Sequence, residues 1–303
     1  MNGEGVAISL FSGADGLDLG AERAGYEVRA AVEWDRDAAA TMEKNFGHLV
    51  SPVIQRDILQ TPTPEILAEA RPHRFVLENV YALTYNNTAS RPAFQRLMHE
   101  IGEAGYHCRA AVLNAADYGV PQSRPRLFVI GVPKDEPLPD LPGPTHGGPW
   151  ERRISGDPRR PHVTAGKALA GVTAAPEPDE QVNGKYGHLL AAIPPGDNYL
   201  FYTERRGHPE PLFRWRGKYW SFLLKLSPDR PSPTIQAQPG PYVGPFHWDN
   251  RRLRVAEIKR LFGYPDDFEL VGSRASIQAQ LGNSVPPALA ETVIRALGAG
   301  APG

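Results

Sequence analysis

The sequence predicts an α/β protein with one large domain and a smaller, loop-rich lobe. Short apolar runs alternate with helical stretches in the first half, prolines crowd the middle, and helix signals return near the end. A chain of 303 residues that is 41% apolar can bury a core of this size. We expect a first domain over residues 1–149, a lobe over 150–233, and a return to the first domain over 234–303.

The first half is expected to form strands and helices in turn. Residues 6–11 (VAISLF) are an apolar run without a helical period, and the helical stretch LDLGAERAG that follows ends at Gly25, a typical C-cap. A second strand over 28–34 leads into a helix over roughly 36–46, and 53–58 forms a third strand. Such alternation predicts a parallel sheet with helices on both faces and ligands at the carboxyl ends of its strands.

The sequence becomes rich in proline and turn-forming residues after residue 132. Twenty of the 31 prolines lie between Pro133 and Pro245, which a doubly wound sheet cannot accommodate. We therefore expect the lobe to consist of loops held by short strands. Helices are predicted over 254–263 and 286–298, each ending at a glycine.

Charge and cysteine content limit the possible functions. Residues 1–72 carry twelve acidic against six basic side chains, and residues 150–230 carry thirteen basic against nine acidic. A basic middle suits a phosphate-contacting surface, although a solvated face of mixed charge is the commoner explanation. The single cysteine, Cys108, excludes an internal disulfide and a Cys-rich zinc site. The absence of a long apolar stretch and of a leader indicates no membrane association and a cytoplasmic location.

Three predicted strand ends carry groups that suit an adenosine. The FSGADG turn after the first strand brings backbone N–H groups and a helix N-terminus toward a ligand, although a purely structural turn explains it equally well. Glu33 can accept both hydroxyls of a ribose, Trp34 can stack on adenine, and Asp57 can accept from the adenine amino group. The alternative is that these residues are solvated loop acids and a half-buried indole.

Four segments resemble the DNA cytosine-5 methyltransferase family, in the family's order. They are 8–20 (ISLFSGADGLDLG), 75–80 (FVLENV), 118–132 (YGVPQSRPRLFVIGV) and 278–288 (QAQLGNSVPPA). The resemblance implies a Rossmann-like methyltransferase sheet, S-adenosylmethionine as cofactor, double-stranded DNA as partner, and a role in restriction-modification. It makes the predicted lobe the target-recognition part and the first domain the cofactor-binding and catalytic part.

The same resemblance implies the cofactor site. Asp15 stands where the family usually has the first of two paired glycines, so it either pairs with the cofactor's amino or sulfonium group or crowds the loop. The family's C-terminal Gly-Asn-Ser-Val segment packs beside that loop. The implied cofactor residues are Phe11, Ser12, Gly13, Ala14, Asp15, Gly16, Leu17, Glu33, Trp34, Asp57, Ile58, Asn283, Ser284 and Val285.

The family's chemistry needs a thiolate at C6 of cytosine, a glutamate at N3 and an arginine at O2. By resemblance Glu78 is that glutamate, with Asn79 positioning it, and Arg126 lies near the base, with Gln122 and Arg124 as supports. From the residues alone, a paired strand-end acid and two arginines on the wet face of a strand explain the same pattern.

The family's Pro-Cys element is missing. Only 20 residues separate Asp57 from Glu78, which is too short for the strand, loop and helix that the family places there. The sheet should therefore lack a central strand, and the flank of the first strand should be exposed unless 75–80 moves in to pair with it. Cys108 lies in YHCRAAVLN, which alternates like a strand, so we expect a small buried side chain rather than a nucleophile.

Residues 212–222 (LFRWRGKYWSF) suggest a hairpin with an aromatic and a cationic face. Such a hairpin can stack bases and contact phosphates, or it can be an ordinary hairpin core with a solvated outer face. Residues 227–238 resemble the family segment that ends the recognition region.

Three hypotheses follow. The first is a methyltransferase of this family. The second is a catalytically silent binding protein, or one half of an enzyme whose second chain supplies the Pro-Cys loop; without such a partner the chain should be a monomer. The third, another adenosine-binding Rossmann-like enzyme, leaves the QSRPR and GNSV segments unexplained.

Overall fold

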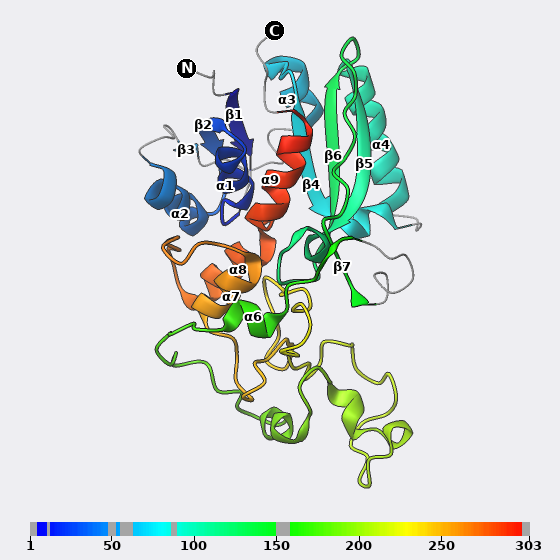
Figure 1. The fold of residues 1–303 in the computed structure, drawn as a ribbon, viewed down its shortest axis with the longest axis vertical. Helices are drawn as coiled ribbons and strands as arrows, with labels where there is room; N and C mark the ends of the chain where they lie inside the picture. Colours follow the sequence, from blue (N-terminus) through cyan, green and yellow to red (C-terminus); the bar gives the residue numbers. More distant parts are fainter. Residues whose placement is uncertain are drawn as a thin grey trace.

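The computed structural model describes residues 5–10, 13–47, 53–54, 63–85, 90–149 and 158–298. Its amino-terminal part is a parallel sheet in the order β1-β2-β3, flanked by helices as the sequence predicts (Figure 1). Asp35 begins the second helix because its side chain accepts a hydrogen bond from the Ala38 N–H. The elements are β1 (Gly5–Leu10), α1 (Gly16–Arg23), β2 (Tyr26–Val32), α2 (Arg36–Phe46) and β3 (Val53–Ile54).

A second sheet has the order β4-β6-β5 and is antiparallel. The expectation of a parallel sheet is wrong for this half. The chain reverses over residues 115–124, and β6 then runs antiparallel to both β5 and β4 and lies between them. Helices α3 and α4 lie against one face of this sheet. The elements are α3 (Thr63–Ala70), β4 (Phe75–Val80), η2 (Tyr81–Thr84), α4 (Ser90–Glu103), β5 (Tyr106–Asn114), η3 (Ala115–Tyr118) and β6 (Pro125–Pro133).

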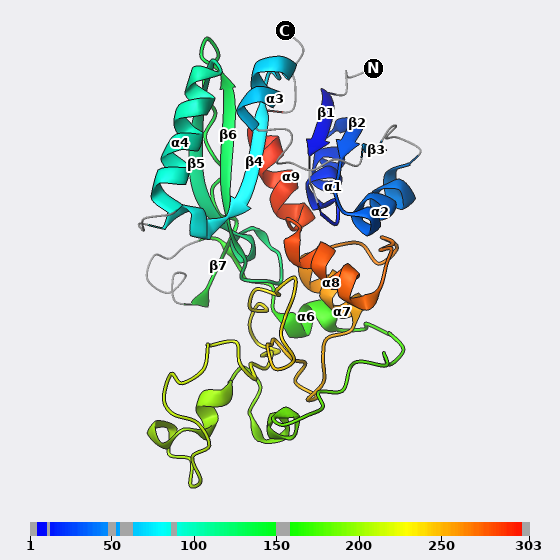
Figure 2. The same ribbon diagram turned by 180° about the vertical axis from the view of Figure 1, so that it is seen from behind.

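The two sheets do not join within the described residues. β1 pairs with β2, β4 pairs with β6, and 75–80 has not moved in to pair with β1. Helix α9 (Pro287–Ala296) lies between the two halves and packs into the hydrophobic core of each (Figures 1 and 2). The predicted gap in the sheet is therefore an interruption, and α9 holds its two sides together.

Most of the lobe and the residues that follow it to Phe246 share a hydrophobic core, which contains Tyr199, Phe222 and Phe246, whereas Ala165 and Leu169 pack into the core of the first domain. Where short strands were expected, the described residues form mostly 3-10 turns and isolated bridges, because proline removes the N–H groups that strands need. The elements are β7 (His146–Gly147), β8 (Arg160–Pro161), α6 (Ala165–Leu169), η4 (Gly187–Ala192), η5 (Tyr199–Tyr202) and η6 (Glu204–Arg206).

The hairpin prediction for 212–222 is wrong. These residues form turns, and Phe222 forms a bridge with Val243 rather than with its own segment. The rings of Phe213 and Phe222 lie 5.7 Å apart in the lobe's core, so these two side chains join the core instead of lining a strand. Tyr219 and Trp220 stay exposed.

The carboxyl-terminal helices return to the first domain. Helix α7 (Val255–Phe262) ends at Gly263, whose φ is +80°, and α9 is followed by Gly298 with φ +77°. Both ends agree with the prediction, because glycine adopts this left-handed conformation without strain. Between them lies α8 (Arg274–Asn283). In the part of the chain that the structure describes, no helix has the length and apolar character required to cross a membrane.

Candidate active site

The glycine-rich turn after β1 contacts the GNSV segment from the other end of the chain. A Cβ atom added to Gly16 would lie 1.8 Å from the carbonyl oxygen of Val285, and one added to Gly13 would lie 3.4 Å from that of Gln280. The Tyr264 hydroxyl donates to the Ala14 carbonyl at 2.8 Å. Glycine is therefore required at position 16 by the close approach of two backbones.

Asp15 is buried inside this turn. It has φ 57°, is 1% exposed, and its Oδ2 accepts no hydrogen bond from any described residue. Burial raises the pKa of Asp15 well above its usual value, and the charges of Asp18 and Glu33 raise it further. A buried carboxyl group with an unused acceptor suits a cationic ligand group.

Glu33 links the turns that follow β1 and β2. Its Oε2 accepts from the Gly13 N–H at 3.2 Å, and its Oε1 accepts from those of Trp34 at 2.7 Å and Asp35 at 3.0 Å. Burial raises the pKa of Glu33, while these three hydrogen bonds oppose the rise. The Trp34 indole is 62% exposed beside this carboxylate.

The other predicted cofactor residues are distributed around the same turn. Ala14 is fully buried, Leu17 packs against the core around α9, and the Ser284 hydroxyl donates to the Leu281 carbonyl at 2.9 Å. Asn283 is exposed beside them. Val285 supplies the carbonyl that contacts position 16. Phe11, Ser12, Asp57 and Ile58 lie outside the described residues.

Glu78 and Arg126 form a largely buried ion pair. Glu78 is paired with Phe128, and Arg126 lies two positions from Phe128 on β6. Residues two positions apart share a face, so Glu78 and Arg126 project from the same face of the sheet. Arg126 Nε lies 2.9 Å from Glu78 Oε1, and the side chains are 9% and 15% exposed. Burial raises the pKa of Glu78 against the pull of Arg126 and Arg124, and burial lowers the pKa of Arg126. Asn79 is exposed and accepts from the Val80 N–H at 2.8 Å.

Arg124 is enclosed by protein and holds three segments together. It donates to the carbonyls of Ile235 at 3.1 Å and Ser284 at 3.0 Å, and also to that of Gly282. Burial lowers its pKa to about 9. These contacts fit the predicted supporting role, since they fix the GNSV segment to the start of β6. Sequence reasoning missed Tyr264 and its contact with the glycine-rich turn, because a tyrosine after a helix carries no signal of a long-range hydrogen bond.

Cys108 lies on the opposite face of the sheet from Glu78. Cys108 is paired with Gly131 and Glu78 with Phe128, and positions an odd number apart on β6 face opposite sides. Its Sγ lies 3.9 Å from Met98 Sδ, and burial raises the pKa of the thiol. This placement supports the prediction of a core residue.

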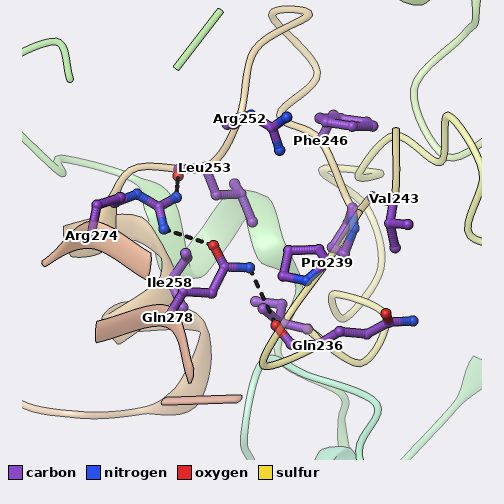
Figure 3. Close-up of a pocket in the computed structure, with 12 residues that line it drawn as sticks. Gln236, Pro239, Val243, Phe246, Arg252, Leu253, Ile258, Arg274 and Gln278 are labelled. Atoms are coloured by element: carbon purple, nitrogen blue, oxygen red, sulfur yellow. Dashed lines mark hydrogen bonds between the residues drawn. The ribbon is translucent and has the colours of Figure 1, made fainter. Parts of the chain in front are cut away.

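Two pockets lie outside this site. The first, at the junction of the lobe with α7 and α8, includes Gln236, Leu253, Arg274 and Gln278 (Figure 3). Arg274 donates to the Leu253 carbonyl and the Gln278 side chain, both at 2.7 Å, and Gln278 donates to the Gln236 carbonyl at 3.2 Å. These polar side chains are hydrogen-bonded to one another and to backbone carbonyls, so we interpret the pocket as a packing junction between the lobe and the carboxyl-terminal helices.

The second pocket lies in the lobe and combines basic and aromatic side chains. Lys185 Nζ lies 5.2 Å from the centre of the Tyr186 ring, and elsewhere in the lobe the Arg205 guanidinium lies 4.4 Å from the centre of the Trp215 ring. The pocket is lined by Lys185, Tyr186, His188, Leu189, Leu212, Phe213, Arg214, Gly217 and Lys218. Cations beside aromatic rings are typical of surfaces that contact nucleic acids.

The sequence profile of the C-5 cytosine-specific DNA methylase family matches residues 6–63 and 55–299. The chain is 38% identical to the type II methyltransferase M.SacI of Streptomyces achromogenes, over 98% of this chain and 93% of that protein. It is 30% identical to M.NgoFVII of Neisseria gonorrhoeae, over 92% and 83%.

Solved structures agree on the fold. An E. coli prophage protein described as a DNA modification methyltransferase superposes with a TM-score of 0.70 at 20% identity, covering 97% of this chain and 98% of that one. The S. pombe Dnmt2 methyltransferase superposes with a TM-score of 0.60 at 14% identity, covering 96% and 97%. Members of a DNA methylase family need a methyl donor and a DNA substrate. This chain belongs to the C-5 cytosine-specific DNA methylase family.

Proposed function

We propose that this chain binds S-adenosylmethionine and double-stranded DNA and acts in methyl transfer to C5 of cytosine, supplying the groups that hold the base but not the attacking thiol. The buried Glu78–Arg126 pair carries this proposal. It lies at the carboxyl end of β4, on the same edge as the glycine-rich turn. By the family resemblance, Glu78 and Arg126 are the residues expected beside the target base, and their pairing at this strand end supports that assignment.

The turn after β1 suits the cofactor. Asp15 offers an unused buried acceptor to the α-ammonium or sulfonium group, Glu33 suits the ribose hydroxyls, and Trp34 suits the adenine ring. Asn283, Ser284 and Val285 border the same turn. The bound cofactor supplies an electrophilic methyl group.

Glu78 and Arg126 suit a cytosine turned out of the duplex. A thiolate that adds to C6 gives the ring the electron density with which C5 takes the methyl group, and loss of the C5 proton and the thiolate restores the double bond. Burial favours the protonated form of Glu78, which lets it donate to N3 as the ring gains electrons. The Arg126 guanidinium can donate to O2.

The chain's own thiol does not serve this chemistry, since Cys108 faces the core under α4. We therefore expect the isolated chain to bind both ligands without turnover. Calorimetry should detect S-adenosylhomocysteine, and the chain should prefer DNA that carries a cytosine opposite an abasic site over fully paired DNA. Glu78→Gln and Arg126→Met should remove that preference and keep cofactor binding. Equal binding of both DNAs by the unmodified chain would count against the proposal.

A further inference from the structure

The edges of β1 and β4 face the same gap and run in the same direction with their ends aligned. At the amino ends, the Gly298 carbonyl accepts hydrogen bonds from the side chains of Tyr26 and Arg74. Tyr26 begins β2 and is paired with Gly5, the first residue of β1, while Arg74 immediately precedes β4. At the carboxyl ends, the glycine-rich turn lies against Ser284, whose carbonyl accepts from Arg124 next to β6. Two parallel edges are thereby held on either side of α9.

One face of β1 is apolar and exposed, and its edge toward β4 has no strand partner among the described residues. Val6 is 50% and Ile8 64% exposed, while Ala7, which points to the other face, packs into the core. Parallel strands are usually buried on both faces, and an exposed apolar edge is a template for pairing with another strand. Val80, at the carboxyl end of β4, is 52% exposed.

Apolar side chains of β4 and α9 connect the hydrophobic cores on the two sides of the gap. Val76 of β4 packs against both hydrophobic cores, and α9 contributes Ile294 to one and Val293 to the other. A strand of about six residues spans about 20 Å, which matches the six residues of β1 and of β4. Neither edge has a strand partner across the gap among the described residues, so both offer backbone groups to such a strand.

Comparison with relatives indicates what is missing here. The family profile matches the chain in two pieces that meet at residues 55–63, between β3 and α3. The alignment with the S. achromogenes enzyme extends over 370 positions, 67 more than the 303 residues of this chain, so that enzyme carries residues that this chain lacks. The two pieces of the profile join between β3 and α3, which is where a further strand, loop and helix would precede β4.

We propose that a strand–loop–helix segment of a second polypeptide inserts between β1 and β4, parallel to both, and that its loop carries a cysteine to the Glu78–Arg126 pair. The inserted strand should be apolar on both sides, and its helix should cover Val6 and Ile8. A second copy of this chain does not qualify, because its only cysteine, Cys108, lies in β5 under α4. The role of the cysteine rests on the proposed function. The strand-binding site between β1 and β4, called the strand site below, does not depend on it.

The probe is the stretch of the S. achromogenes enzyme between its counterparts of Ile54 and Thr63, prepared as a fragment. Hydrogen exchange of the full chain should show new protection in β1 and β4 when the fragment is added, and none in β5, which borders the far side of the second sheet. Ile8→Lys should weaken fragment binding by about tenfold or more, because the inserted helix would bury its charge. Val112→Lys, on β5, is the matched control: Val112 is 44% exposed and lies away from the gap.

Three results would overturn the strand site. The first is that the fragment adds no protection from hydrogen exchange to β1 or β4. The second is that, in the chain alone, β1 and β4 are already as protected as β6. The third is that the chain forms a dimer that Ile8→Lys dissociates. Methyl transfer should appear with the fragment and vanish when its cysteine is replaced by serine. Fragment binding without turnover would support the strand site and count against the proposed function. Turnover that Ile8→Lys leaves unchanged would count against insertion at this gap.

Discussion

Replacing Gly16 by alanine tests whether the two ends of the chain form one site. The added Cβ would lie 1.8 Å from the Val285 carbonyl oxygen and 2.8 Å from the Tyr264 hydroxyl. An ordinary carbon–oxygen contact needs about 3.3 Å or more, so the turn and the GNSV segment must separate by roughly 1.5 Å. Overpacking of this kind costs about 1–3 kcal/mol, while alanine recovers up to about 1 kcal/mol in a helix.

We expect Gly16→Ala to lower the free energy of unfolding by about 1–2 kcal/mol and to weaken S-adenosylhomocysteine binding. Urea denaturation followed by circular dichroism and calorimetry measure the two effects. Gly102→Ala is the matched control, since this α4 glycine has no atom within 4 Å of its added Cβ and should leave stability equal or higher. If Gly16→Ala unfolds at the same urea concentration as the unmodified chain and binds the ligand equally well, the close approach is wrong.

Three further predictions concern the ligands and pH. Trp34→Ala should weaken S-adenosylhomocysteine binding by roughly 1–3 kcal/mol if the exposed indole stacks on adenine, and unchanged calorimetry would remove it from the site. The pKa of Asp15 is raised in the folded state, so the folded protein keeps this proton to higher pH than the unfolded chain does, and the free energy of unfolding falls as pH rises above the usual pKa of 3.8. Asp15→Asn should therefore become more stable than the unmodified chain from about pH 4 upward. Curves of stability against pH that run parallel for the two proteins would refute this. DNA binding should weaken with salt at a log-log slope of about −0.9 per phosphate contact, and Lys185→Gln or Lys218→Gln should make the slope shallower while Lys44→Gln on α2 should not.

Local patterns predicted much of the fold. The bounds of α2 and β4 agree with the expected 36–46 and 75–80, because an N-cap aspartate and an apolar run define them locally. The glycines that end α7 and α9 were predicted for the same reason. By contrast, the hairpin at 212–222 failed, since the core of the lobe gathers aromatic side chains from distant segments and overrides the local alternation.

The candidate site shows the same division. Motif resemblance selected Glu78, Arg126 and the glycine-rich turn, and the shortness of the segment before Glu78 predicted the missing strand. No local signal could indicate that Arg124 would be buried among carbonyls, that Tyr264 would contact Ala14, or that β4 would run antiparallel to β6. Such contacts join residues more than a hundred positions apart in the first two cases, so side-chain periodicity does not encode them.

The sequence by itself determined elements such as α2, β4 and the ends of α7 and α9, the family's motifs, and the lack of a cysteine shortly before Glu78, because each depends on neighbouring residues or on composition. Only the tertiary structure decided that β4 stays apart from β1, that Cys108 faces away from Glu78, and that α9 holds the two half-sheets with their carboxyl ends aligned. The physical reason is that a strand's pairing partners and the face of each side chain are set by register and by the packing of a distant helix, neither of which the chain specifies locally.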